Sequence, residues 1–246
     1  MDEKHAPIMP PMRRGLTPLR FAVATGYLAL AAVVYLCFAP SAPLAQPSLF
    51  NRDQGAVAHK LVPLEAHIMS KCPDARDCLR DLVLPTMQKV HDKVNFTLSY
   101  IGTTTEHDDG VECKHGPEEC LGNIIELCAQ RLYPNPKTYL GFTNCLTQDY
   151  TLIPQRSLIE DCALEHAIDF NKLNECATKD DGAFGVGMLR ESVQRSAAAG
   201  VIKSCTVRLN NEFYCIRDGG EWKDCPSGPG VNDLVVAIRK LYSSSA

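Results

Sequence analysis

The sequence predicts an α/β domain that begins near residue 61 of the 246-residue chain. Three features lead to this expectation: a strand–helix–strand unit at the start of the domain, a long cysteine-rich helical region, and a closing β-hairpin followed by a helix. About two hundred residues follow an N-terminal apolar segment, enough for one domain of ordinary size with an insertion.

The first unit is a βαβ crossover. Residues 61–69 alternate apolar and other side chains, which predicts a strand. A helix follows, with Pro73 in its first turn and Pro85 bending its interior. Residues 94–101 are β-branched and aromatic and predict the second strand. The crossover between these two strands is expected to be right-handed.

The middle of the domain is expected to be a helical insertion over about residues 113–180. Residues 102–110, rich in Gly, Thr and Asp, predict a loop that leads into it. The first helix is expected to begin at Pro117, and Pro154 breaks a later one. Residues 184–199 predict another helix after the insertion.

The end of the domain predicts a hairpin formed by residues 201–209 and 212–216, and then an amphipathic helix over residues 231–242. This order of elements, β-α-β, helices, β-β, α, is that of a thioredoxin-like domain with a helical, disulfide-rich insertion.

The hairpin also bears on the cysteines. A two-residue turn places Thr206 opposite Cys215, so that Cys205 and Cys215 point to opposite faces. This register favours a disulfide between Cys215 and Cys225 and leaves Cys205 for the other face.

The N-terminus predicts a membrane anchor. Residues 21–39 are uncharged and nearly all apolar, long enough to span a bilayer as a helix. Residues 1–20 carry four basic and two acidic side chains, so the positive-inside rule makes them a cytosolic tail. We expect a single-pass type II protein, with residues 40–60 as a stalk and residues 61–246 in the lumen of the secretory pathway, lysosome or vacuole. A cleaved signal peptide is the alternative, and would give a secreted protein.

Cysteine usage agrees with a lumenal address. Eleven of the twelve cysteines follow the apolar segment, and such a density predicts a disulfide framework. An odd number leaves at least one thiol that is free or that pairs between chains. Asn95 lies in the only Asn-x-Ser/Thr sequon and predicts one N-glycan. The net charge of −4 and the lack of a basic cluster argue against nucleic-acid binding.

Residues 113–128, which read CKHGPEECLGNIIELC, are the densest motif in the chain. Cys120 and Cys128 lie two helical turns apart, so each needs a disulfide partner elsewhere. The stretch resembles the signature of the gamma-interferon-inducible lysosomal thiol reductase (GILT) family, with Lys114 where the family has glutamine. The matching residues are Cys113, His115, Gly116, Glu119, Cys120, Asn123 and Cys128.

The resemblance implies a thioredoxin-like thiol reductase that acts on disulfide-containing proteins. Such an enzyme needs a nucleophilic cysteine at the start of the first helix, and Cys72 occupies that position. The family motif Cys-x-x-Cys ends here at Ala75 instead of a resolving cysteine. Cys78 is one candidate resolver, although it bonds Cys72 only if the first helical turn is unwound; Cys205 is the other.

Other features oppose a reductase mechanism. Asp74 and Asp77 lie close to Cys72 in sequence and disfavour a thiolate. No proline lies between Pro154 and Pro226, so the cis-proline that thioredoxin-like enzymes place before the third strand is absent, and a structural bridge between Cys72 and Cys205 becomes an option.

Three interpretations stay open. The first is a lumenal thiol oxidoreductase with Cys72 as nucleophile, and the second a redox-inactive binding or chaperone-like module stabilised by disulfides. The third is an interaction domain with zinc on Cys113, His115, Cys120 and Cys128. We favour the first and expect no metal and no cofactor.

Overall fold

The computed structural model describes residues 60–106 and 110–245. The tail and membrane anchor expected at residues 1–39, and all but the last residue of the expected stalk, lie outside this part of the chain. Among the described residues, no helix has the length and apolar character needed to cross a bilayer.

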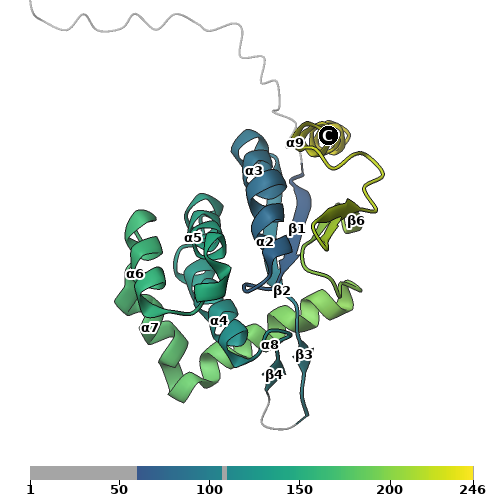
Figure 1. Ribbon diagram of the computed structural model, residues 1–246. Coiled ribbons are helices and arrows are strands. Elements are labelled where there is room, and N and C mark those ends of the chain that lie inside the picture. The colour runs from purple at the N-terminus through teal and green to yellow at the C-terminus, as the bar shows by residue number, and fades with distance from the viewer. Residues whose placement is uncertain (1–59, 107–109, 246) are drawn as a thin grey trace, which may run out of the picture. The chain divides into compact units, whose positions relative to one another are not determined.

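The centre of the domain is a five-stranded sheet in the order β2-β1-β5-β6-β7 (Figure 1). β1 (Val62–Ile68) and β2 (Val94–Tyr100) are parallel. β5 (Thr206–Leu209) pairs antiparallel with β1, and β6 (Glu212–Asp218) and β7 (Glu221–Lys223) continue the sheet antiparallel. A parallel βαβ pair beside an antiparallel hairpin is the thioredoxin-like arrangement that the sequence predicts.

The crossover from β1 to β2 is one helical run with a change of pitch. α2 (Pro73–Cys78) begins at the predicted proline, continues as a π-helical segment η1 (Leu79–Val83), and ends as α3 (Leu84–Val90). Pro85 has no backbone N–H to donate to the preceding turn, which accounts for the change in hydrogen bonding just before it.

Helices cover both faces of the sheet. α9 (Val231–Ser243) packs against α3. α8 (Ala183–Ala198) packs against β2 on the other face, where the His67 Nδ1 lies 2.8 Å from Ser196 Oγ. Because side chains alternate along a strand, the buried Ile68 beside His67 points to the face of α3 and α9.

Between β2 and α8 the chain forms the predicted helical insertion, drawn in teal and green in Figure 1. Its helices are α4 (Pro117–Leu132), α5 (Pro136–Gln148), η2 (Tyr150–Leu152), α6 (Arg156–Glu165), α7 (Phe170–Thr178) and η3 (Lys179–Gly182). β3 (Thr103–Thr104) lies within the loop expected at residues 102–110, and it pairs antiparallel with β4 (Val111–Glu112), which follows that loop.

The hairpin register differs from the predicted one. A β-bulge makes Val207 pair with Cys215, and Thr206 pairs with Ile216 rather than with Cys215. Cys205 exchanges backbone hydrogen bonds with Arg217, so Cys205 and Cys215 lie on the same face of the sheet. The premise that they face opposite ways is therefore wrong, although Cys215 bonds Cys225 as that argument favoured.

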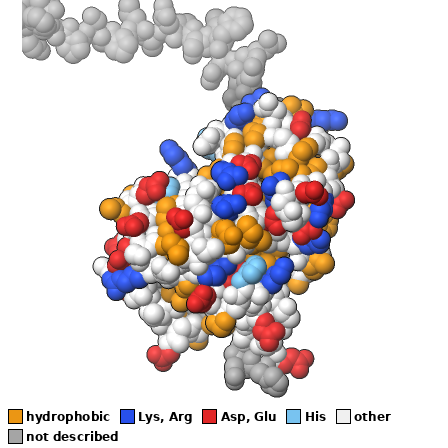
Figure 2. Space-filling model, in the orientation of Figure 1, with side chains coloured by type: hydrophobic (Ala, Val, Ile, Leu, Met, Phe, Trp, Pro, Cys, Tyr) orange, Lys and Arg blue, Asp and Glu red, His pale blue; other side chains and the backbone are white. Residues whose placement is uncertain are grey.

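Ten cysteines of the described residues form five disulfides, and Cys72 is the one left with a free thiol. The pairs are Cys78–Cys205, Cys113–Cys120, Cys128–Cys176, Cys145–Cys162 and Cys215–Cys225. On the face shown in Figure 2, acidic and basic side chains are interspersed, with small apolar areas between them.

Candidate functional site

Cys72 sits at the entrance to the crossover helix. It is the N-cap residue of α2, with extended backbone dihedral angles, and its carbonyl oxygen accepts hydrogen bonds from the N–H groups of Ala75 and Arg76. Its Sγ lies 3.8 Å from the carbonyl oxygen of Ser204, and its side chain is 8% exposed. The thiol thus lies at the N-terminus of the crossover helix and contacts the loop that precedes β5.

Neither candidate resolver is a free thiol. Cys78 and Cys205 are bonded to each other, and both are fully buried. This disulfide excludes, in the structure described, both a Cys72–Cys78 bond and the Cys72–Cys205 bridge considered from the sequence. The Ser204–Cys205 peptide bond is cis, at the place where the sequence lacks a proline. The sequence predicts that Cys205 lies close to Cys72. In the structure the contact with Cys72 is made by the carbonyl oxygen of Ser204, the residue before Cys205.

The acidic residues expected to oppose a thiolate are paired with arginines. An oxygen of Asp77 lies 2.9 Å from Arg76 Nε and 3.2 Å from Arg80, and its other oxygen lies 3.5 Å from Arg217. Partial burial opposes ionisation of Asp77, but its hydrogen bond with Arg76 and the positive charges of all three arginines outweigh burial and lower its pKa. The negative charge of Asp77 is thus locally compensated.

Asp74 and Lys71 are also occupied elsewhere. The carboxylate of Asp74 accepts hydrogen bonds from the backbone N–H groups of Gly219 and Gly220, which ties the start of α2 to the turn between β6 and β7. The ammonium group of Lys71 donates to Glu118 at 3.0 Å and to backbone carbonyls. Asp74 and Lys71 therefore hold the start of α2 in place.

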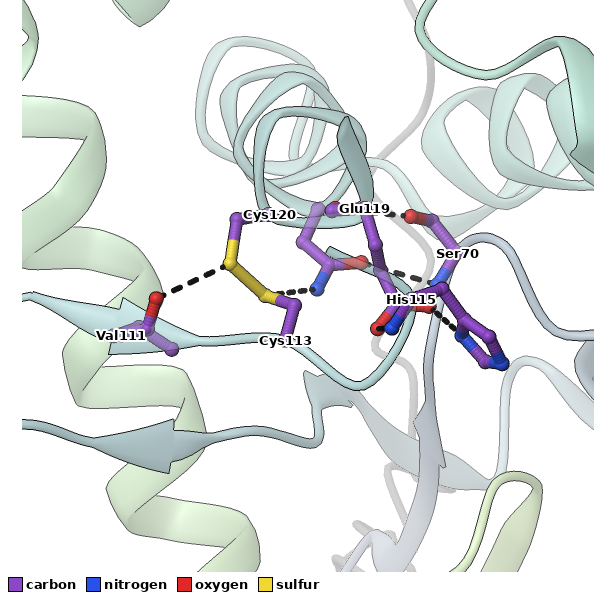
Figure 3. Close-up of a disulfide and its surroundings, with 7 residues drawn as sticks. Ser70, Val111, Cys113, His115, Glu119 and Cys120 are labelled. Atoms are coloured by element: carbon purple, nitrogen blue, oxygen red, sulfur yellow. Dashed lines mark hydrogen bonds and ion pairs between the residues drawn. A yellow bond between two sulfur atoms is a disulfide. The ribbon is translucent and has the colours of Figure 1, made fainter. Parts of the chain in front are cut away.

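The signature residues build a second cluster at the start of α4 (Figure 3). Asn123 is fully buried; its Oδ1 accepts from the Ser70 N–H at 3.0 Å, and its Nδ2 lies 3.7 Å from Cys113 Sγ. Ser70 Oγ donates to the carbonyl oxygen of Glu119 at 3.2 Å. Since Ser70 is two residues before Cys72, the motif fixes the approach to the candidate nucleophile.

His115 pairs with Glu119 in this cluster. Its Nδ1 hydrogen-bonds the carboxylate of Glu119, which is fully buried, while the His115 side chain is 32% exposed. Gly116 has φ +85°, a value that favours glycine, and it turns the chain from Cys113 into α4. The histidine thus has a structural partner, and its exposed edge faces solvent.

The zinc set inferred from the sequence is not available in this structure. Cys113 and Cys120 are bonded to each other and Cys128 to Cys176, so their sulfurs are not metal ligands. Within the described residues, a different group with metal-ligand side chains is Cys145, Glu165 and His166. The sulfur of Cys145 is likewise in a disulfide, with Cys162.

Sequence reasoning missed two supporting serines. Ser204 Oγ accepts a hydrogen bond from the Met69 N–H at 2.9 Å, and Ser70 joins the signature helix. Both are polar yet almost fully buried, and both sit within two residues of a candidate redox cysteine. That proximity was the available signal.

Comparison with known proteins decides the family. The model of the family "Gamma interferon inducible lysosomal thiol reductase (GILT)" matches residues 63–166. Residues 63–166 therefore belong to the GILT family. The matched segment runs from β1 through α6, so it contains Cys72 and the whole signature but not Cys205.

Curated relatives share the family name. GILT-like protein 1 of Drosophila melanogaster is 27% identical over 150 residues, which cover 54% of this chain and 60% of that protein. The gamma-interferon-inducible lysosomal thiol reductase of Carassius auratus is 35% identical over 71 residues, 27% of this chain and 28% of its own length. The chain thus spans 60% or less of these relatives.

Solved structures with some likeness include two bacterial proteins. Oxidised BdbD of Bacillus subtilis has a TM-score of 0.46 and 14% identity, over 74% of this chain and 88% of that one. The thiol-disulfide exchange protein α-DsbA2 of Wolbachia pipientis has a TM-score of 0.49 and 13% identity, over 92% of this chain and 100% of that one.

Proposed function

We propose that this domain exchanges disulfides of protein substrates through Cys72. The observation that carries the proposal is the free thiol of Cys72 at the N-terminus of α2, in a domain whose other described cysteines are all bonded. Membership of residues 63–166 in the GILT family supports a thiol reductase or exchange role.

The chemistry requires two steps. The Cys72 thiolate attacks one sulfur of a substrate disulfide, a mixed disulfide forms, and the second substrate sulfur leaves as a thiolate that takes up a proton. A second thiol must then release Cys72. Ala75 cannot do so, and Cys78 and Cys205 are oxidised. We therefore assign release to a thiol of the substrate or of a small reductant, with Cys205 or Cys78 able to take this role only after their own bond is reduced.

An insulin-reduction assay tests this proposal, with dithiothreitol or free cysteine as the electron donor at acidic and neutral pH. We expect the Cys72→Ser variant to lose most of its turnover and to form no mixed disulfide at position 72. A Cys78→Ser/Cys205→Ser variant tests the second step: it keeps turnover if an external thiol releases Cys72. Unchanged turnover in Cys72→Ser refutes Cys72 as the nucleophile.

A redox-inactive binding module is the second candidate. The 8% exposure of Cys72 and the alanine at position 75 favour it, because both restrict disulfide exchange. Under this alternative, the wild-type protein shows no turnover at any pH and still binds reduced, unfolded polypeptide. The same assay, with a binding measurement added, separates the two candidates.

The proposed location of the domain rests on sequence features. We propose that residues 21–39 anchor the chain in a membrane, with the domain in the lumen of the secretory pathway, lysosome or vacuole, where disulfides persist. Asn95 is exposed on β2, as an N-glycan requires. Protease protection in microsomes and a mobility shift on deglycosylation, lost in Asn95→Gln, test both points.

A further inference from the structure

The disulfide between Cys113 and Cys120 differs from the other four in its exposure. Both of its cysteines are partly exposed, whereas each other pair has at least one buried cysteine. It also closes the shortest loop of the five, with a sequence separation of 7. Opening a short loop costs the fold the least conformational order, so this bond can be broken with the domain intact.

A surface cavity of about 460 Å³ borders this disulfide. Its lining comes from β4, the following turn and the first two turns of α4, and it is mostly apolar. Leu121 and Ile124 lie in its wall, and Leu121 is 44% exposed. An apolar side chain of a peptide can therefore be held beside the two sulfur atoms.

The two sulfurs have opposite polar neighbours (Figure 3). Cys113 Sγ lies 3.7 Å from the Nδ2 donor of Asn123, while Cys120 Sγ lies 3.4 Å from the carbonyl oxygen of Val111. A hydrogen-bond donor stabilises a thiolate, and a carbonyl oxygen stabilises a protonated thiol. Asn123 is held in orientation by the bond from the Ser70 N–H to its Oδ1.

From these observations we propose that Cys113 and Cys120 form a second redox centre, a dithiol that reduces peptide disulfides. The Cys113 thiolate attacks the substrate disulfide and forms a mixed disulfide, and the released substrate thiolate takes the proton of Cys120. Cys120 then attacks Cys113 Sγ, the second substrate sulfur leaves as a thiol after protonation, and the Cys113–Cys120 bond seen in the structure is restored. The two electrons come from a thiol reductant that reopens this bond.

This centre contains the resolving cysteine that Cys72 lacks. It does not depend on the function proposed for Cys72, so the two can fail separately. The required experiment uses Cys72→Ser as background, in which exchange at Cys72 is removed.

The first test measures the order in which the disulfides open. The folded protein is equilibrated in glutathione buffers of increasing reducing strength, and free thiols are alkylated and identified by mass spectrometry. We expect Cys113 and Cys120 to be alkylated while Cys128–Cys176 is still intact. If these two pairs open together only as the protein unfolds, the proposal is refuted.

The second test measures turnover. We expect Cys72→Ser to retain part of the insulin-reduction activity, and the triple variant with Cys113→Ser and Cys120→Ser to lose it. A control triple variant with Cys145→Ser and Cys162→Ser removes another disulfide and should keep the activity of the Cys72→Ser background. Equal activity of the two triple variants refutes the second centre.

The third test addresses Asn123. In Asn123→Asp the Oδ1 acceptor for the Ser70 N–H is kept, but the donor to Cys113 is replaced by a negative charge. We expect the pH profile for alkylation of Cys113 in the reduced protein to shift to higher pH, with that of Cys120 changed less. An unshifted Cys113 profile in a folded variant shows that Asn123 does not position a thiolate there.

Discussion

Glu126 is a buried acid whose protonation links the stability of this domain to pH. It is fully buried on α4, and one of its oxygens accepts a hydrogen bond of 2.8 Å from the Tyr100 hydroxyl. Its other oxygen, Oε1, has no hydrogen-bond partner. Burial, assisted by the nearby charge of Glu119, raises the pKa of Glu126 to about 8.

The sign of the effect follows from proton linkage. Between its ordinary pKa of 4.5 and about 8, the folded state binds a proton that the unfolded state has lost, so stability is greatest below pH 4.5 and falls as pH rises. From about pH 5 to pH 7.5 this one residue reduces the free energy of unfolding by about 3 kcal/mol.

Glu126→Gln removes this dependence while keeping an acceptor for Tyr100. Urea unfolding of wild type and variant, with disulfides intact, should give similar stabilities near pH 5 and a variant more stable by about 3 kcal/mol near pH 7.5. Comparing the two proteins at each pH cancels the opposite contribution of His67, whose pKa burial lowers and whose stabilisation is lost as pH falls below 6.5.

Glu175→Gln on the exposed surface of α7 is the matched control and should leave the profile unchanged. A difference between wild type and Glu126→Gln that stays constant from pH 5 to pH 7.5 would show that Glu126 does not titrate in this range in the folded domain.

Two further predictions concern packing and cross-links. Gly122→Ala places a Cβ 2.4 Å from the Ile153 side chain and 2.7 Å from Ser70 Oγ, so urea unfolding should show a cost of about 1–3 kcal/mol. At Gly187 a Cβ meets no atom within 4 Å apart from the neighbouring backbone of its own helix, so Gly187→Ala should stabilise α8 by up to about 1 kcal/mol. Equal effects would exclude close packing as the cause. Replacing both cysteines of Cys128–Cys176, with a sequence separation of 48, by serine should lower the free energy of unfolding by about 4 kcal/mol. The same replacement in Cys145–Cys162, with a separation of 17, should lower it by about 3 kcal/mol. The reverse order would refute the loop-entropy argument.

The strands and helices of the core could be predicted from local signals. Alternation along residues 61–69 and the prolines at positions 73 and 117 set the element starts, and β1, α2 and α4 begin within one residue of the expected positions. The ribbon of β3 and β4 was missed because two-residue strands carry no periodicity.

The cysteine pairing could not be predicted in the same way. A bulge in β6 depends on how two strands pair and not on the sequence of either alone, and it moved Cys215 to the face of Cys205. Likewise Cys78 reaches Cys205 across 127 residues, a contact that only the packing of α2 against β6 brings about. Cys113–Cys120, in contrast, is a local bond with a sequence separation of 7. The helical spacing of Cys120 and Cys128 does not reveal it, because Cys113 lies in the turn before α4 and not on the helix.

Asn123 connects the two sulfur sites physically. One amide group contacts Cys113 through its nitrogen and the backbone of Ser70 through its oxygen, and Ser70 leads directly into Cys72. A substitution that tilts this amide must disturb both contacts, because the plane of the amide is rigid. Effects of Asn123 variants on Cys72 are therefore expected even if Cys113 never reacts, and only replacement of the two cysteines themselves separates support from redox chemistry.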